Sequence, residues 1–409
     1  MPFFALVLSC ALLVTACSNE SPEISGHSFR AFQENGITNA ENEGGPKYGG
    51  ELFSFDRICT VLEEERNPES LLYWPDDGMA GPDGEIVIND RGNNRVVIFN
   101  PDGSFRTSFG RKGNGPGEFQ NRRLLWVRGD TIAVFDWMLS RTSLFTMDGA
   151  LLKVITPFRR SGILHDLYAL SENTQLRIER RETRTGEERF RSEVAVIYST
   201  TEDTLGIVAS KPHSNGWPFH SAGITGISRL VFGPASDIDV HPEYGLLTWS
   251  SDEPIIRWHS WDGHVTRIIR LDFPVEPVTD ADRTNHHEYW QGMIRAQDEE
   301  RQRQFYREWE QQERFPEHKS LWSSLMVDDA GYLWFRDHYD YTGPPRVFES
   351  GAYKVCSPEG EYLGDVTRPG PRGWIQNGYY LARVENQETE LAEYTLYRIT
   401  PNVRGLEYP

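Results

Sequence analysis

An internal repeat is the feature that most restricts the fold of this 409-residue chain. Residues 84–105, GEIVINDRGNNRVVIFNPDGSF, align without a gap on residues 130–151, DTIAVFDWMLSRTSLFTMDGAL. The identical positions are Ile86/Ile132, Asp90/Asp136, Arg95/Arg141, Phe99/Phe145, Asp102/Asp148 and Gly103/Gly149. Each copy has the pattern strand, turn, strand, turn, and a period in the forties with four short strands is typical of a β-propeller blade. The chain is therefore expected to be all-β.

Looser copies of the repeat follow along the chain. A late Asp-Gly or Glu-Gly turn recurs at residues 262–263 and 359–360, residues 167–210 fit a divergent unit, and residues 374–402 fit an incomplete one. The sequence thus predicts a six-bladed β-propeller. Because the last blade ends after its third strand, we expect residues 51–64 to pair with residues 390–402, closing the ring and covering exposed sheet edges.

Two segments carry a resemblance to a known group of proteins. Residues 89–110, NDRGNNRVVIFNPDGSFRTSFG, resemble an NHL-type repeat, and residues 109–119, FGRKGNGPGEF, resemble the connector between blades of bacterial six-bladed propellers. From Cys17 onwards the order of parts resembles the exported six-bladed β-propeller lipoproteins, which implies a fold but little chemistry. The glycine-rich connector is not predicted to bind phosphate, because another hairpin follows it instead of a helix N-terminus.

The N-terminal residues predict export. Residues 1–16, MPFFALVLSCALLVTA, form a short uncharged apolar run typical of a signal peptide. The run Val14-Thr15-Ala16-Cys17 resembles the bacterial lipoprotein cleavage box, which implies lipidation of Cys17. An ordinary signal peptide or an N-terminal anchor is the alternative. Residues 17–48 are rich in Ser, Asn, Glu and Gly and predict a flexible tether, followed by a propeller over residues 49–409.

Charge and compartment narrow the expected partners. The formal net charge is −19, and nucleic-acid binding needs a concentrated basic face, so we expect no nucleic-acid partner. The first expected partner is a membrane of the bacterial cell envelope, which the protein reaches through a lipid anchor on the periplasmic or surface side. The second is a ligand, expected to be an envelope protein, a peptide or a glycan. Two cysteines, Cys59 and Cys356, remain in the predicted propeller. We expect two free thiols, with one disulfide as the alternative.

Loop lengths point to one face of the ring. The turns GPDG, NPDG, TMDG, SWDG and SPEG are tight, whereas residues 211–234, 274–320 and 338–350 form long connections on the opposite face. Long loops on a rigid scaffold usually carry binding, so the protein is predicted to bind a ligand or protein there. Residues 279–315 predict a helical insertion between blades four and five, acting either as a lid over a ligand or as a fixed structural cap.

Aromatic and histidine side chains are the predicted binding residues of this long-loop face, because such rings stack on sugars and peptides. Surface-loop packing is the alternative interpretation. The candidates are Trp217, His220, His286, Trp290, His338 and Tyr339. Adjacent histidines at positions 286 and 287 point about 100° apart on a helix, so they do not form the one-face pair of a zinc helix, and we expect no metal there.

Carboxylates of the innermost strands support an alternative function. Six-bladed propellers include metal-assisted enzymes, among them calcium-dependent lactonases, that gather acids around the channel. Here Asp77, Asp237 and Asp239 are the candidates, although the sequence does not fix which of them face the channel. This alternative is a metal-assisted hydrolase or lyase using Ca²⁺, whereas the favoured binding scaffold needs no cofactor. No G-x-S-x-G nucleophile motif occurs.

One repeated pair is predicted to be structural. Asp90 with Arg95 recurs at the same spacing as Asp136 with Arg141. A catalytic group would not normally be copied in successive blades, so we expect two hydrogen-bonded ion pairs that fix the loops.

Overall fold

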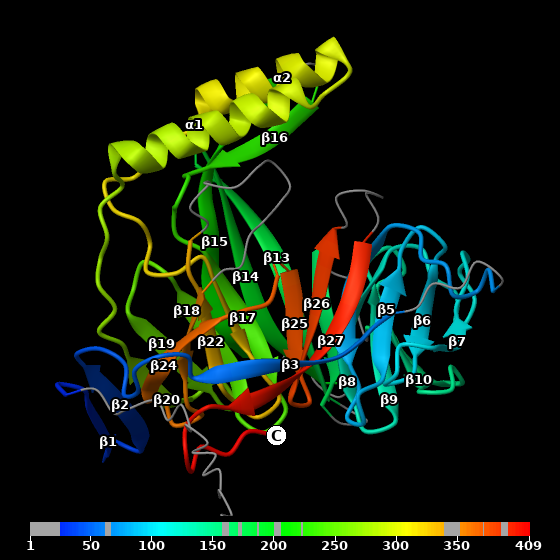
Figure 1. Ribbon diagram of the computed structural model, residues 1–409, viewed down its shortest axis with the longest axis horizontal. Helices are drawn as coiled ribbons and strands as arrows, with labels where there is room; N and C mark the ends of the chain where they lie inside the picture. Colours follow the sequence, from blue (N-terminus) through cyan, green and yellow to red (C-terminus); the bar gives the residue numbers. More distant parts are fainter. Residues whose placement is uncertain are drawn as a thin grey trace, which may run out of the picture.

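Six β-sheets stand around a central axis in the computed structural model, which confirms the six-bladed β-propeller (Figure 1). The described residues are 25–61, 67–157, 163–170, 174–185, 188–199, 206–221, 224–338, 352–370, 372–385 and 392–409. The strands that follow one another in each blade pair antiparallel, and the first strand of each blade lies innermost. The buried residues form clusters between neighbouring blades; one of them unites Val87 and Val96 of blade one with Leu124 and Val134 of blade two.

Four blades have strands close to the expected positions. Blade one comprises β4 (Pro75–Ala80), β5 (Ile86–Asp90), β6 (Arg95–Phe99) and β7 (Phe105–Phe109). Blade two comprises β8 (Arg122–Arg128), β9 (Thr131–Asp136), β10 (Arg141–Thr146) and β11 (Leu151–Ile155). Blade four contains β17 (Ser236–His241), β18 (Gly245–Ser250), β19 (Ile255–His259) and β20 (Val265–Arg270). Blade five comprises β21 (Ser324–Val327), β22 (Leu333–Arg336), β23 (Ala352–Cys356) and β24 (Tyr362–Thr367).

The sixth blade is built from both ends of the chain. Its inner strands are β25 (Arg372–Gln376), β26 (Tyr379–Glu385) and β27 (Ala392–Pro401), and its outer strand is β3 (Phe53–Thr60). The pairing of β3 with β27 runs from Thr395 opposite Thr60 to Pro401 opposite Phe53. This confirms the predicted closure of the ring by the N-terminal strand.

Ahead of the closing strand, a hairpin replaces part of the expected tether. Strands β1 (Ser28–Glu34) and β2 (Ile37–Glu43) pair with each other, and β2 adds in parallel to β20, so blade four becomes a six-stranded sheet. The prediction of a flexible tether over residues 17–48 is therefore wrong for residues 25–48. The segment has few large apolar groups, but the edge of β20 supplies backbone partners that composition does not reveal.

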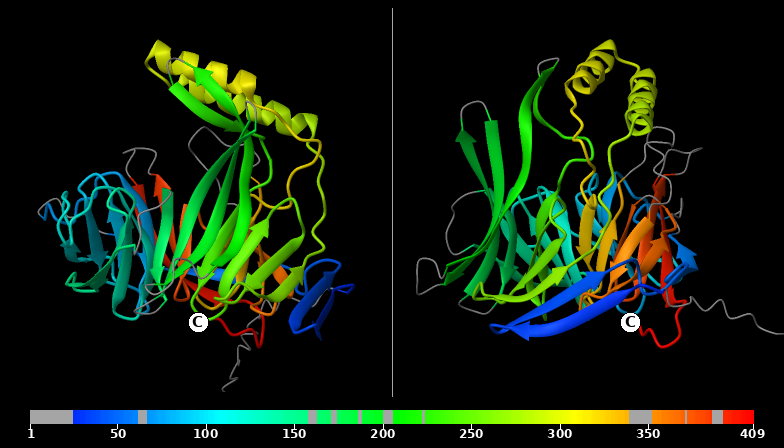
Figure 2. Two further views of the ribbon diagram at one scale, coloured as in Figure 1. Left: turned by 180° about the vertical axis from the view of Figure 1, so that it is seen from behind. Right: turned by 90° about the vertical axis from the view of Figure 1, so that its left-hand side faces the viewer.

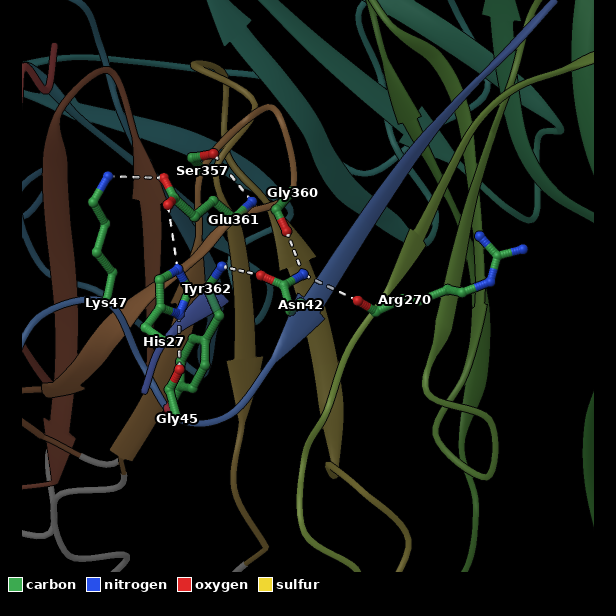
Figure 3. Close-up of polar contacts among 9 residues, drawn as sticks. All are labelled: His27, Asn42, Gly45, Lys47, Arg270, Ser357, Gly360, Glu361 and Tyr362. Carbon is green, nitrogen blue, oxygen red and sulfur yellow. Dashed lines mark hydrogen bonds and ion pairs between the residues drawn. The ribbon is translucent and has the colours of Figure 1, made fainter. Parts of the chain in front are cut away.

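Polar side chains fasten this hairpin to blades four and five (Figure 3). The buried Asn42 amide donates to the carbonyls of Arg270 (3.0 Å) and Gly360 (2.9 Å) and accepts from the Tyr362 backbone N–H (2.8 Å). Glu361 lies 3.2 Å from His27 and 3.1 Å from Lys47. The hairpin is thus fixed to the ring, on the side away from the helices (Figure 2).

Blade three departs most from the common pattern. It has five strands: β12 (Ile163–Ala169), β13 (Thr174–Thr185), β14 (Glu188–Ser199), β15 (Gly206–Ser221) and β16 (Ile224–Arg229). The interpretation of residues 211–234 as a long loop is wrong for residues 211–221 and 224–229, which pair in β15 and β16. The segment contains Pro212 and Pro218, and a hairpin at the end of a long strand tolerates proline where no ladder bond is needed.

Two helices form the insertion between blades four and five, as predicted. Helix α1 (Asp280–Arg295) begins at a capping box in which Thr279 and Asp282 bond reciprocally, and α2 (Glu300–Gln312) packs beside it. Figure 2 shows both helices beyond one end of the ring, next to the tip of blade three. None of the helices in the described part of the chain is both long and apolar enough to span a bilayer.

The two cysteines are free thiols, as expected. Cys356 is buried in blade five and Cys59 is half-buried in β3. Burial raises the pKa of the Cys356 thiol well above its usual value, so this side chain behaves as a small apolar group of the core.

Candidate functional site

A cavity of about 300 Å³ lies in the central channel. Its walls come from the first strands of all six blades, because these strands stand closest to the axis. The lining side chains include Met79 of β4, Trp126 of β8, Tyr168 of β12, Asp239 of β17, Met326 of β21 and Trp374 of β25. The channel is therefore a hollow with polar and aromatic walls.

The structure shows which of the predicted channel acids face the cavity, a question that the sequence leaves open. Asp237 and Asp239 both line the cavity, since residues two apart on a strand share one face. The carboxylate of Asp239 also accepts a bond from the Trp249 indole N–H at 3.0 Å. Both acids of β17 are therefore part of the cavity wall.

The third predicted acid, Asp77, lies near the start of β4 and is not among the residues that line the cavity. Its carboxylate accepts the backbone N–H of Leu124 at 3.0 Å, so it joins blades one and two. Loss of hydration raises the pKa of Asp77 to about 7, and the neighbouring Asp76 adds to this rise while Arg123 opposes it. A carboxyl with such a pKa exchanges its proton near neutral pH.

Charged residues missed in the sequence complete the cavity wall. The guanidinium of Arg123 pairs with Asp166 of β12, and Asp328 and Asp329 of blade five also contribute to the lining. Burial raises the pKa of Asp328 to about 6, although its carboxylate accepts bonds from the Trp334 indole at 2.8 Å and the Tyr408 hydroxyl at 2.6 Å. The only sequence signal for these residues is that side chains alternate between the two faces of each innermost strand. In a short strand this alternation does not show which residues face the channel.

The channel acids do not fit a divalent cation. Calcium takes six to eight oxygen ligands, several of them carboxylates that converge on one point. Within the described ranges, no group of three or more His, Cys, Asp or Glu side chains converges in this way. Asp77, Asp237 and Asp239 instead lie on two strands of different blades, and Asp77 and Asp239 already accept hydrogen bonds from the protein.

The aromatic candidates of the insertion come together as a packed cluster. The Trp290 indole donates to His286 at 3.1 Å, and the rings of His286 and Phe315 meet edge to face at 5.2 Å. Phe315 contacts Phe232, which in turn contacts His338 at 5.6 Å. His286 is only 3% exposed. The observed packing therefore corresponds to the structural alternative, with the rings filling the base of the insertion.

Burial also sets the charge of this cluster. It lowers the pKa of His286 to about 4 and raises that of the nearby Glu313 to about 7, with the two side chains 3.1 Å apart. The pair is thus held in its neutral form in mildly acidic solution. Three candidates stay untested: Trp217 and His220 lie in β15 but their side chains fall outside the described part, as does Tyr339 entirely.

The repeated Asp and Arg residues are structural, but only one pair is an ion pair. The Arg95 guanidinium donates to Asp90, which is fully buried, at 2.8 Å. Asp136 instead accepts the backbone N–H groups of Gln120 (2.6 Å) and Asn121, while Arg141 donates to the carbonyls of residues 114, 115 and 118. Both side chains hold the glycine-rich connector, because its residues place backbone groups within reach.

Comparison with known proteins supports the fold. A family model described as a 6-bladed β-propeller, DUF5128, matches residues 80–156, which comprise blade two and most of blade one. No curated protein matches the sequence.

Solved structures similar to this chain are distant in sequence. A protein from Bacteroides fragilis named as exported is 12% identical, with a TM-score of 0.47, covering 85% of this chain and 94% of its own. A DUF4221 family member from Bacteroides vulgatus is 8% identical, with a TM-score of 0.45 and coverages of 85% and 97%. An inactive variant of virginiamycin B lyase from Staphylococcus aureus is 11% identical, with a TM-score of 0.33 and coverages of 78% and 83%.

Proposed function

We propose that this protein is an exported β-propeller that binds a ligand in and above its central channel, as a scaffold without chemistry of its own. The observation that carries the proposal is the cavity of about 300 Å³ lined by all six blades. Pockets of this size that combine aromatic walls with a few fixed polar groups are typical ligand sites.

The wall chemistry favours a polar ligand. Carboxylates outnumber guanidinium groups in the lining, which contains Asp166, Asp237, Asp239, Asp328 and Asp329 but only Arg123 and Arg128. The aromatic faces of Trp126 and Trp374 suit stacking on a sugar ring or an apolar side chain. An amino sugar, or a short peptide with a basic side chain, matches both properties.

The N-terminal segment supports a membrane-tethered arrangement in the cell envelope. If Cys17 carries the lipid, the chain from Cys17 to Ser25 spans at most about 28 Å when fully extended. The hairpin that follows is fixed on the side of the ring away from the helices. The long-loop face and the insertion would then point away from the bilayer, toward an envelope protein, peptide or glycan. We propose no nucleic-acid partner for this acidic chain.

A metal-assisted hydrolase or lyase is the alternative. It is favoured by Asp77, whose pKa of about 7 suits proton transfer. The carboxylates of the channel do not assemble a Ca²⁺ site, so we assign no step to a metal. Under this alternative, purified protein would contain a divalent ion and a chelator would lower its melting temperature, whereas a scaffold would be indifferent to the chelator.

The direct test of the scaffold uses a panel of amino sugars, envelope glycan fragments and basic dipeptides in thermal-shift and calorimetric titrations. A Met326→Trp variant should abolish the binding of any hit, because the added indole fills the cavity that Met326 lines. Met138→Trp is the matched control, since Met138 is 72% exposed and lies outside the cavity. A hit that survives Met326→Trp would place the binding site elsewhere and refute a channel ligand.

A further inference from the structure

Two arginines at the long-loop end of blades five and six have no described counter-charge. Arg336 is the last residue of β22, and Arg368 directly follows β24. Both strands run toward the end of the ring that carries the helical insertion, because the connection from blade five to blade six leaves there. The two guanidinium groups therefore lie at the same end of the ring.

Arg368 is buried without an acidic partner. Only 2% of this residue is exposed, and its guanidinium lies 5.3 Å from the ring of Tyr353 and donates to the Tyr353 hydroxyl at 3.3 Å. Its Nε atom has no hydrogen-bond partner among the described residues, but the same holds for Arg122 and Arg141, so the missing acid and not this atom sets Arg368 apart. A buried charge that faces only neutral groups is costly unless an opposite charge joins it.

Arg336 brings a second positive charge to the same tyrosine. It lies opposite Tyr353 in the pairing of β22 with β23. In the part of the chain that the structure describes, its guanidinium forms no hydrogen bond and no ion pair, and the adjacent Asp337 is engaged by Lys354 at 2.8 Å. Burial lowers the pKa of Arg336, and so do the nearby Arg368 and Arg372, whereas Tyr353 and Tyr380 act in the opposite direction.

A buried arginine of blade two shows what a purely structural arrangement looks like. Arg122 is 3% exposed, but its guanidinium donates to the carbonyls of Asp90 (2.7 Å) and Arg95 (2.5 Å), and three carboxylates lie near it. Neither Arg336 nor Arg368 has such carbonyl or carboxylate partners among the described residues. In a chain with net charge −19, two neighbouring arginines that meet no acid among the described residues are unexpected.

We propose that Arg336 and Arg368, with the Tyr353 hydroxyl, form a binding site for an oxyanion, separate from the channel cavity. The planar guanidinium group matches a carboxylate, phosphate or sulfate through paired N–H donors. An acidic sugar or a phosphorylated ligand would offer this group. Neither arginine lines the channel cavity, so this site does not depend on a channel ligand.

The test measures binding of sulfate, phosphate and galacturonate at constant ionic strength, with chloride as the reference salt. At least one of the three anions should raise the melting temperature of the wild-type protein above that in chloride. Arg336→Met keeps the length of the side chain and removes its charge, and should weaken that binding by at least about tenfold. The response of galacturonate relative to phosphate distinguishes a sugar acid from a phosphoryl group.

Stability provides the second readout. In chloride alone, Arg336→Met should melt at the same or a higher temperature than wild type, because it relieves repulsion with Arg368. Arg106→Met is the matched control: Arg106 pairs with Asp148 at 2.7 Å, and its loss should leave the anion response unchanged. A destabilised Arg336→Met variant, an equal response of wild type and Arg336→Met, or no anion response in wild type would each overturn the proposal.

Discussion

At the scale of single residues, Asp77 shows how the ring alters one carboxyl group. The side chain sits between blades one and two, where it accepts the Leu124 N–H but loses much of its hydration. The pKa rises to about 7 from an ordinary value near 4, so the native state retains a proton that the unfolded chain has lost. Between these two values the native state binds more protons than the unfolded state, and stability must fall as pH rises.

This argument predicts that the free energy of unfolding declines from about pH 4 to about pH 7 through Asp77. Asp77→Asn, which keeps the shape and stays neutral, should flatten this decline by on the order of 2 kcal/mol. This is about half of the full three-unit value, because the side chain is only partly buried. Urea unfolding at several pH values measures the difference between the two proteins. A constant difference across this range would contradict the raised pKa.

Site residues could be predicted only where chemistry and position coincide in the sequence. Asp237 and Asp239 were accessible to sequence reasoning because two acids in one short strand share a face, whichever face that is. Arg336 and Arg368 were not, because each lies at a strand end and they meet only through the pairing of β22, β23 and β24. Contact between residues far apart in sequence depends on register, which a single sequence leaves open.

At the scale of elements, the tight turns were the most predictable feature. The glycines that end GPDG, NPDG, TMDG, SWDG and SPEG all have positive φ, from 81° at Gly149 to 99° at Gly360. In each turn this glycine N–H donates back three residues, as from Gly103 to Asn100 at 2.9 Å. A left-handed glycine leaves a strong local signal. The hairpin β1–β2 also carries such a signal, because Asn35 and Gly36 form its two-residue turn with φ of 51° and 80°. The polar composition of the segment outweighed this turn in the prediction of a tether.

The helical insertion is predicted to be separable from the ring. Its two connecting segments pair with each other, through Val278 to Glu317 (3.0 Å) and Lys319 to Glu276 (2.8 Å), so the ends already meet without the helices. Helix α2 buries none of its residues. Replacing residues 280–313 by a short Gly-Ser linker should therefore leave a cooperatively folded propeller, as measured by circular dichroism and calorimetry.

Loss of cooperative unfolding in that deletion variant would show that the insertion is part of the core. The cluster of His286, Phe315, Phe232 and His338 is the contact through which such an effect would act. Phe232→Ala in the full-length chain is the matching test, since it weakens this contact but retains both helices. If the insertion clamps the ring, Phe232→Ala should lower the melting temperature, and the deletion should lower it at least as much.

At the scale of the whole molecule, stability should depend on the junction of β3 with β27. This junction joins the two ends of the chain, and without it the propeller would be an open arc with a free edge. Phe53 of β3 is 1% exposed and packs on Trp334 (5.4 Å) and Tyr408 (4.9 Å), so the closing strand also contacts blade five and the C-terminus. The hairpin β1–β2 adds to one blade only.

The closing strand β3 is therefore predicted to contribute more to the free energy of unfolding than the hairpin β1–β2. Phe53→Ala should reduce the free energy of unfolding by about 3–5 kcal/mol, the usual cost of a large cavity in a core. Phe29→Ala in β1 is the matched control and should cost less than about 1 kcal/mol, because Phe29 is only partly buried against the core of blades four and five. Urea unfolding of both variants measures the two losses in the free energy of unfolding. Equal losses would mean that the hairpin belongs to the closure of the ring, and a small loss for Phe53→Ala would mean that the ring is held by its blade-to-blade cores alone.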